Sequence, residues 1–214
     1  MENIIKKHKD HWFQKDFLNS VFLGFILLST SLIANRLASD YAALNTGAPV
    51  GDLFLDLIKQ PINVEPLMVY GPIAIISFIF FLLLKEPKRI PFVLKSTALF
   101  ILIRSFFVIL THLSPLPGQI PIRDGFFLNI IGLNNTSDMF FSGHTGFPFL
   151  YALVFWNDSI LRYIFIFTSV FFAVTVLLGH MHYSIDVFSA FFITYTIFII
   201  SERFFIKDRK VFLD

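Results

Sequence analysis

Residues 179–186 (GHMHYSID) place a histidine and an aspartate at a spacing that suits nucleophilic chemistry. His182 and Asp186 are four residues apart, so they share one face of a helix. A carboxylate bound to one ring nitrogen fixes the imidazole tautomer and makes the other nitrogen the better nucleophile. The pattern predicts a nucleophilic His182 oriented by Asp186; the alternative is an interfacial pair with a purely structural role.

Residues 138–146 (DMFFSGHTG) offer an anion site beside a second histidine. Ser142 and Gly143 stand at the start of an apolar run. Backbone N–H groups at the start of a helix, together with the positive end of its dipole, favour an anion. His144 follows directly and is placed to protonate a leaving oxygen. The alternative interpretation is a glycine kink with a buried histidine.

Arg104 is the third candidate, because it lies deep inside an apolar run. Ionisable groups are costly in a bilayer and generally line a protected polar site, and the guanidinium fork suits phosphate. An ion pair with Asp138 or Asp186 is the structural alternative. Nucleophile, orienting acid, proton donor and anion clamp are the parts that phosphoryl transfer requires.

A metal site is the competing chemistry. His180, His182 and Asp186 would offer two imidazoles and a carboxylate, but residues two apart diverge on a helix. The chain has no cysteine, which excludes disulfides, thiolate metal sites and cysteine nucleophiles. We therefore expect a site without a metal ion.

The composition of the chain predicts that membrane helices hold these residues. The 214 residues are 56% hydrophobic, with a mean hydropathy of +0.72, which is typical of an integral membrane protein. A span needs about 20 apolar residues. We predict an all-α fold, one six-span catalytic domain over residues 17–201, with spans near 17–37, 67–84, 91–113, 139–156, 163–180 and 184–201.

The charged residues predict the topology. Residues 1–16 read as an amphipathic helix on the membrane surface, and residues 202–214 as a basic cytoplasmic tail. Lys and Arg gather at both ends and in alternate loops, whereas the other loops hold only Lys59 and Arg123. By the positive-inside rule both termini are cytoplasmic. The three catalytic candidates then face the outer leaflet of the cell membrane.

The first outer loop, residues 39–66, carries its own signals. Asn35 and Arg36 are expected to close the first span before it. Residues 47–51 (GAPVG) predict a turn, and Asp52 is expected to cap a short helix through Gln60. The helix would face lipid with Leu53, Phe54 and Leu57. The loop is either a plain connector or a lid over a lipid-binding pocket.

These motifs resemble the sphingomyelin synthase branch of the phosphatidic acid phosphatase type 2 superfamily. Residues 138–145 resemble its Ser-Gly-His-Thr motif, and residues 180–186 its His-Tyr-Thr-Val/Ile-Asp motif. Residues 104–118 resemble a motif that begins with Arg and ends in Leu-Pro-x-Pro-Gly, and residues 47–57 loosely match a first-loop motif. The resemblance covers roughly residues 40–190, and the missing extra N-terminal domain favours a small bacterial member.

The resemblance implies roles for individual residues. His182 would attack phosphorus and form a phosphohistidine-type intermediate, Asp186 would activate it, and His144 would protonate the departing alcohol. No metal or cofactor is implied. The sequence departs from the family motifs at two positions. Val176 lies six residues before His182, where the classic phosphatases of the superfamily have arginine. Met181 stands where the branch has an acidic residue, which puts the choice of head group in doubt. The expected substrate-binding residues are Arg104, Asp138, Ser142, Gly143, His180 and Tyr183.

The predicted function is transfer of a phospho-head group from a membrane phospholipid to a lipid alcohol, ceramide or diacylglycerol. The alternative keeps the same site but uses water, as in a lipid phosphatase or a phospholipase C. A transporter is the alternative outside enzymes; it would show polar residues at mid-membrane on several helices and often an inverted repeat. No nucleic-acid partner is expected.

Overall fold

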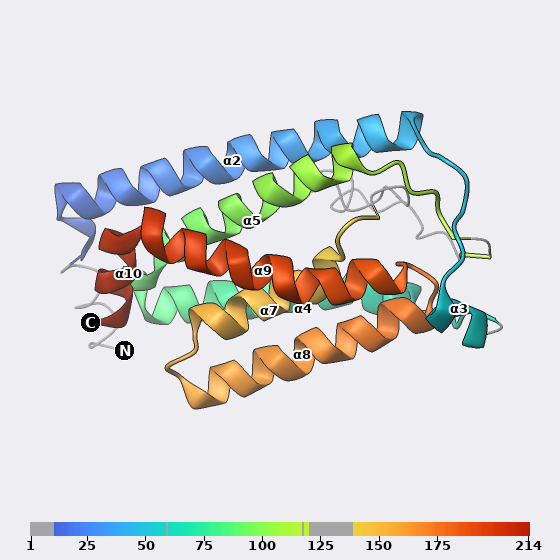
Figure 1. Ribbon diagram of the computed structural model, residues 1–214. Coiled ribbons are helices and arrows are strands. Elements are labelled where there is room, and N and C mark those ends of the chain that lie inside the picture. Colours follow the sequence, from blue (N-terminus) through green and yellow to red (C-terminus); the bar gives the residue numbers. More distant parts are fainter. Residues whose placement is uncertain (1–10, 59, 117, 120–138) are drawn as a thin grey trace.

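The computed structural model describes residues 11–58, 60–116, 118–119 and 139–214, and every regular element there is a helix (Figure 1). This agrees with the predicted all-α class. In chain order the elements are α2 (Lys15–Leu44), α3 (Leu53–Leu57), α4 (Glu65–Lys85), η1 (Pro87–Arg89), α5 (Ile90–Leu110), α7 (Gly143–Val154), α8 (Ser159–Leu178), α9 (Ser184–Phe204) and α10 (Ile206–Leu213).

Among the residues that the structure describes, five segments are long and apolar enough to cross a membrane: α2, α4, η1 with α5, α8 and α9. The predicted span near 139–156 instead contains α7, whose 12 residues rise only about 18 Å. That is less than the roughly 30 Å of a hydrocarbon core. The six-span count therefore stays a prediction. The surface helix over 1–16 also stays one, because residues 1–10 lie outside the described residues.

Helix α2 extends further than the sequence predicted. Asn35 and Arg36 were expected to end the first span, but the helix continues to Leu44. Asn35 is buried and accepts a hydrogen bond from the Ser105 hydroxyl at 3.5 Å. Arg36 pairs with Asp40 one turn later at 3.1 Å, a spacing that supports a continuing helix. Both polar residues therefore lie within the helix.

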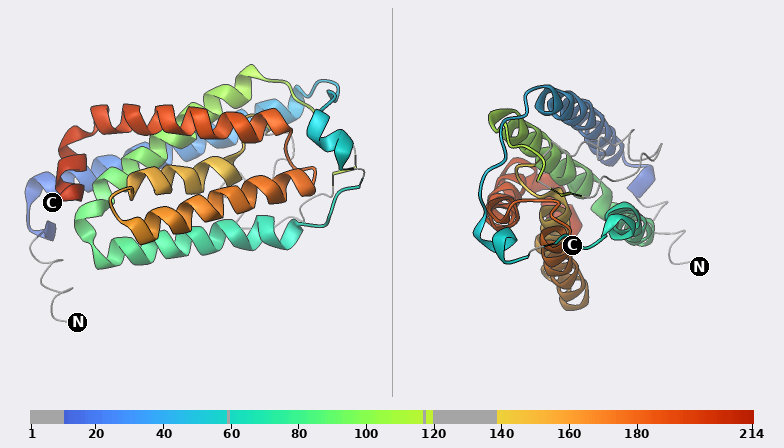
Figure 2. Two further views of the ribbon diagram at one scale, coloured as in Figure 1. Left: turned by 60° about the horizontal axis from the view of Figure 1, so that its bottom comes forward. Right: turned by 90° about the vertical axis from the view of Figure 1, so that its right-hand side faces the viewer.

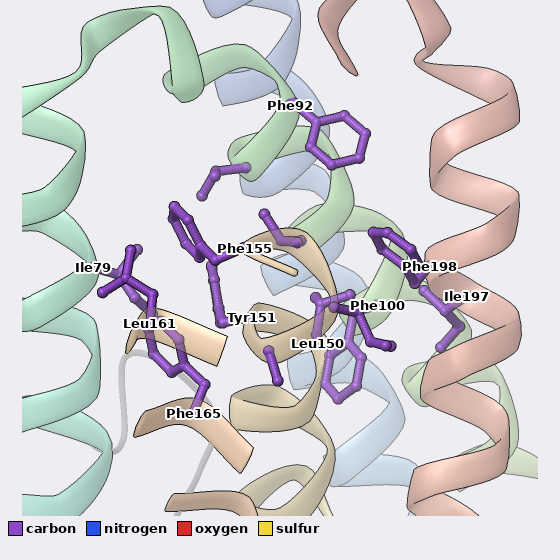
Figure 3. Packing of buried hydrophobic residues seen from close by; sticks show 14 of the residues in the cluster. Ile79, Phe92, Phe100, Leu150, Tyr151, Phe155, Leu161, Phe165, Ile197 and Phe198 are labelled. Carbon is purple, nitrogen blue, oxygen red and sulfur yellow. The ribbon is translucent and has the colours of Figure 1, made fainter. Parts of the chain in front are cut away.

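The helices pack in two connected groups. α7 lies between α8 and α9, and α2 runs along α5 (Figures 1 and 2). The α7–α9 contact depends on Gly146, because a Cβ there would lie 2.8 Å from Thr194 Oγ1. Aromatic side chains fill the interior, including Phe155 stacked on Phe165 with ring centroids 5.8 Å apart (Figure 3).

The C-terminal segment packs onto the bundle. Arg209 of α10 is buried, and its Nη1 donates to the Val154 carbonyl at the end of α7 at 2.8 Å. Its Nε pairs with Glu202 at 2.8 Å. α10 and the start of α2 lie at one end of the bundle, and α3 lies at the other (Figure 1). The predicted site is at the α3 end, where α7 and α9 begin.

Candidate active site

A reversal between α8 and α9 brings the second motif back onto the bundle. The Met181 N–H donates to the Val176 carbonyl at 2.8 Å, and the His180 N–H donates to the Leu177 carbonyl at 3.1 Å. This is the Schellman pattern, with His180 in the left-handed position at φ 51°. The chain turns sharply after Gly179, and α9 begins at Ser184.

His182 is held by two acceptors on one ring nitrogen. Its Nδ1 lies 2.9 Å from the Met139 carbonyl and 3.5 Å from Asp186 Oδ2. Because a carbonyl only accepts, this contact requires the hydrogen on Nδ1, and the lone pair of the neutral ring is then on Nε2. The predicted His182–Asp186 pairing is present. The shorter contact, to Met139, was missed because a backbone carbonyl has no signature in the sequence.

Asp186 also joins the start of its own helix. Its Oδ2 accepts from the Tyr183 N–H at 3.0 Å, so one oxygen serves both the helix start and His182. Asp186 is fully buried. Within the described residues, its Oδ1 has no hydrogen-bond partner. A buried carboxylate oxygen left in this state is costly and calls for a functional reason.

The first motif meets the second through backbone bonds. Ser142 caps α7, and its Oγ accepts from the Thr145 N–H at 3.4 Å. The Ser142 N–H donates to the Asp186 carbonyl at 3.0 Å. The prediction that this N–H is available to an anion is therefore wrong, since it already joins α7 to α9. His144 follows on α7, with its ring centroid 6.5 Å from that of His182.

Arg104, on α5, lies beside the first motif. It is 7% exposed, and its Nε donates to the Phe141 carbonyl at 2.9 Å. A Cβ at Gly143 would lie 3.2 Å from Arg104 Nε, so the glycine provides room for the guanidinium. The structure thus brings Arg104, Gly143, His144 and His182 together, as predicted from their types.

An apolar cavity of about 430 Å³ extends from this cluster between α2, α4, α5 and α7. Arg104 and His144 both line it. Val93 lines it too, eleven residues before Arg104 on α5, which corresponds to about 16 Å along the helix. Two further polar groups in its wall, Thr97 and Tyr151, are hydrogen-bonded to each other at 2.6 Å. Its remaining lining is almost entirely aliphatic and aromatic.

Two predicted substrate-binding residues, His180 and Tyr183, lie away from the cavity. His180 Nε2 lies 2.9 Å from the Ile58 carbonyl. The Tyr183 hydroxyl donates to the Ser114 carbonyl at 3.1 Å and accepts from the Val50 N–H at 3.3 Å. Both residues contact loops, and neither is in the cavity lining. Asp138 lies outside the described residues.

The first outer loop is anchored at Asp52. Its Oδ1 accepts from the Phe54 and Leu55 N–H groups at 3.0 and 3.1 Å, so the predicted cap is confirmed, although α3 ends at Leu57 and not at Gln60. Its Oδ2 accepts from the Ser184 N–H of α9 at 2.6 Å. Burial by itself raises the pKa of Asp52, but the hydrogen bonds from Ser184, Leu55 and Phe54 outweigh it and hold that pKa below its usual value.

The lipid-facing prediction for α3 concerns three side chains. Leu53, Phe54 and Leu57 are all exposed, and Leu55 on the opposite side is buried. Leu55 packs with Leu116 and Tyr183. The exposed face fits the expected contact with lipid, and the buried one shows that α3 is docked on the site and is more than a connector.

Comparison with known proteins finds similarity over the segment that holds both histidine motifs. Residues 136–203, which include α7, α8 and α9, match the PAP2 superfamily C-terminal family model. Sphingomyelin synthase-related protein 1 of Mus musculus is 28% identical over 220 aligned positions that cover 89% of this chain and 45% of the relative. The Homo sapiens protein of that name is 27% identical over 89% of this chain and 52% of its own length. No solved structure matches.

The family match and the long apolar helices support a helical membrane protein similar to enzymes of the PAP2 superfamily. The two relatives add a similarity to sphingomyelin synthase-related proteins over most of this chain. The chain spans about half the length of the curated relatives it matches. Its own reaction is therefore argued from the site.

Proposed function

We propose that this protein is an integral-membrane lipid phosphotransferase that moves a phospho-head group from a phospholipid to a lipid alcohol. The observation that carries the proposal is the cluster of His182, Asp186, His144 and Arg104 beside a lipid-sized apolar cavity. Arg104 and His144 stand where the cavity wall becomes polar, so a phosphate held there would leave the acyl chain along the apolar wall.

In the first half-reaction the Nε2 lone pair of His182 attacks phosphorus. The bond from phosphorus to the diacylglycerol oxygen breaks, and His144 gives that oxygen its proton. The Met139 carbonyl and Asp186 hold the Nδ1–H and stabilise the charge that the ring gains. Arg104 neutralises the phosphoryl oxygens. The product is a phosphohistidine with the head group still attached.

In the second half-reaction a lipid alcohol enters. Its hydroxyl attacks phosphorus, His144 takes the hydroxyl proton, and the bond from phosphorus to Nε2 breaks. His182 is restored, and a new phospholipid leaves. His144 acts first as a general acid and then as a general base, as microscopic reversibility requires.

The acceptor decides between transfer and hydrolysis. With water as the acceptor, the same residues would make the protein a lipid phosphatase or a phospholipase C. The apolar cavity favours transfer, because its walls exclude water and suit an acyl chain. The name of the two relatives, sphingomyelin synthase-related protein 1, points to a sphingolipid acceptor such as ceramide. Diacylglycerol is the other acceptor with the required hydroxyl.

The test is product analysis with a labelled phospholipid and purified protein in detergent, with and without ceramide or diacylglycerol. We expect a new labelled phospholipid only when an acceptor lipid is present. Equal release of water-soluble phosphate or phosphoalcohol in both cases, with no new phospholipid, would show a hydrolase. Resistance to chelators should accompany activity, because the proposed steps use only side chains.

We further propose six spans, with both termini cytoplasmic and the site facing the outer leaflet. The support is the distribution of Lys and Arg. Reporter fusions after Lys88 and after Arg123 test this arrangement. We expect a cytoplasmic signal at the first position and an external signal at the second; an external signal at Lys88 contradicts the topology.

A further inference from the structure

Asp52 occupies an unusual place, because one carboxylate caps two helices. Oδ1 accepts from the Phe54 and Leu55 N–H groups at the start of α3. Oδ2 accepts from the Ser184 N–H at the start of α9, and the Ser184 hydroxyl adds a further bond. The first N–H groups of any helix lack partners within the helix. Asp52 supplies such partners to two helices, and Ser184, at the start of the second one, is 132 residues away in sequence.

The second helix start is where the proposed chemistry takes place. Ser184 is the first residue of α9, two residues after His182 and two before Asp186. The separation of His182 Nδ1 from Asp186 Oδ2, 3.5 Å, is therefore set by the backbone that passes through Ser184. Any shift of this turn moves the nucleophile and its carboxylate relative to each other.

Asp186 is the other carboxylate at this helix start. Its Oδ2 accepts from the Tyr183 N–H at 3.0 Å, next to the N–H that Asp52 accepts. If Asp52 did not occupy the Ser184 N–H, Asp186 would be the nearest acidic group on the same turn. Its carboxylate would then be drawn to the helix end and away from His182.

The loop around Asp52 is fastened on both sides. The Val50 N–H donates to the Tyr183 hydroxyl at 3.3 Å, and the Ile62 N–H donates to the Leu178 carbonyl at 2.9 Å. The Ile58 carbonyl meets His180 Nε2 at 2.9 Å. These bonds place Asp52 within a fixed strap over the α8–α9 reversal, so its carboxylate can act as a rigid support.

We propose that Asp52 is a positioning residue for phosphoryl transfer: by capping α9 at Ser184 it holds His182 and Asp186 in register and leaves the Asp186 carboxylate facing the histidine. The inference rests on the proposed function, since it concerns the same two residues. Asp52 touches neither the cavity lining nor the proposed reacting atoms, so it acts through the backbone of α9.

The variants separate the two caps. Asp52→Asn has one acceptor oxygen and can cap only one helix, whereas Asp52→Ala caps neither. Asp56→Asn is the matched control, because Asp56 is an exposed carboxylate in the same short helix. We expect kcat to fall about tenfold in Asp52→Asn and about a hundredfold in Asp52→Ala, with KM unchanged, as small misplacements of catalytic groups do. Asp56→Asn should match the wild type.

A double-mutant cycle with Ser184→Pro makes the test specific. Proline at the first position of a helix is favourable and has no N–H, and Tyr183 before it is already extended (φ −68°, ψ 154°), as proline requires. This change removes the donor and keeps the helix. We expect Ser184→Pro to lower kcat about as much as Asp52→Asn, and the combined variant to be no slower than either.

Hydrogen exchange followed by mass spectrometry gives a readout that does not need activity. The Ser184 amide should exchange about tenfold faster in Asp52→Asn and Asp52→Ala than in the wild type, the size expected for a lost cap. A kcat of Asp52→Ala within twofold of the wild type, or additive losses in the cycle, overturns the positioning role. If the wild type turns over no lipid while Ser184 exchange still depends on Asp52, the proposed function fails and the double cap stands.

Discussion

Lys95 and Asp186 are buried charged residues at opposite ends of the bundle, and their charges are satisfied differently. At the α10 end, Lys95 Nζ contacts Asp208 Oδ2 at 2.6 Å and Ser20 Oγ at 2.6 Å. Lys95 is 5% exposed, yet its ion pair and hydrogen bond compensate for its burial. At the α3 end, Asp186 is 0% exposed, and its Oδ1 has no hydrogen-bond partner among the described residues.

This difference separates a structural cluster from a chemical one. A buried ion pair is tolerated when each charge has its partner and enough hydrogen bonds. Lys95 and Asp208 meet that condition and join α5 to α10. An unsatisfied buried carboxylate oxygen costs about 1–3 kcal/mol, and a fold retains it where reactivity requires it. The comparison predicts that mutations at one end remove activity and at the other end remove stability.

The largest effect is expected at His182 and Asp186. His182→Ala should lower turnover by about 10⁴-fold or more, because the nucleophile is lost, and Asp186→Asn should approach the same loss. Lipid turnover in detergent, normalised to folded protein, measures both. His112→Ala is the control, because His112 is exposed, follows the end of α5 and does not line the cavity. Full activity in His182→Ala would refute the assignment and make His180 the candidate nucleophile.

The next effect is expected at His144. His144→Ala should slow turnover by about 10³-fold with natural lipids, which is typical of a lost general acid. A substrate with a good leaving group, such as a nitrophenol ester, needs no proton on its departing oxygen. Its turnover should therefore fall much less in His144→Ala. The measurement is the ratio of the two rates in variant and wild type. An equal loss with both substrates would contradict the acid role.

At the opposite end we expect lost stability with retained chemistry. Lys95→Met leaves the half-buried Asp208 without its cation, which costs at most about 3–5 kcal/mol, whereas the double variant Lys95→Met/Asp208→Leu should recover most of this loss. Thermal unfolding in detergent measures both. Turnover per folded molecule should stay at the wild-type level. A catalytic defect in the folded double variant would break the contrast between the two ends.

The smallest effect concerns pH and Asp52. Its pKa is lowered in the folded state, so its contribution to stability is fully present above the unfolded-state pKa of about 3.9. It is lost as the pH falls through the lower folded-state pKa. We expect the melting temperature of the wild type to fall more steeply between about pH 5 and about pH 2 than that of Asp52→Asn. Parallel curves would contradict this, and Asp56→Asn should follow the wild type.

Residue types and local spacing were enough to predict the long helices and the local motifs. Apolar run lengths predicted the five long helices, and the four-residue spacing of His182 and Asp186 predicted their pairing. The cap at Asp52 was also predictable, because its partners follow within three residues. Each of these depends on interactions along a short stretch of chain, where residue type and spacing fix the geometry.

The contacts that join these stretches could be found only from how the helices pack. The Met139 carbonyl on His182, the Asp186 carbonyl on Ser142 and the Ser184 N–H on Asp52 connect segments 43 to 132 residues apart. Two of the three bonds are accepted by backbone carbonyls and the third is donated by a backbone N–H, so residue types alone do not announce them. Helix packing sets which carbonyl or N–H reaches which side chain, and that packing turned a His–Asp spacing into a site.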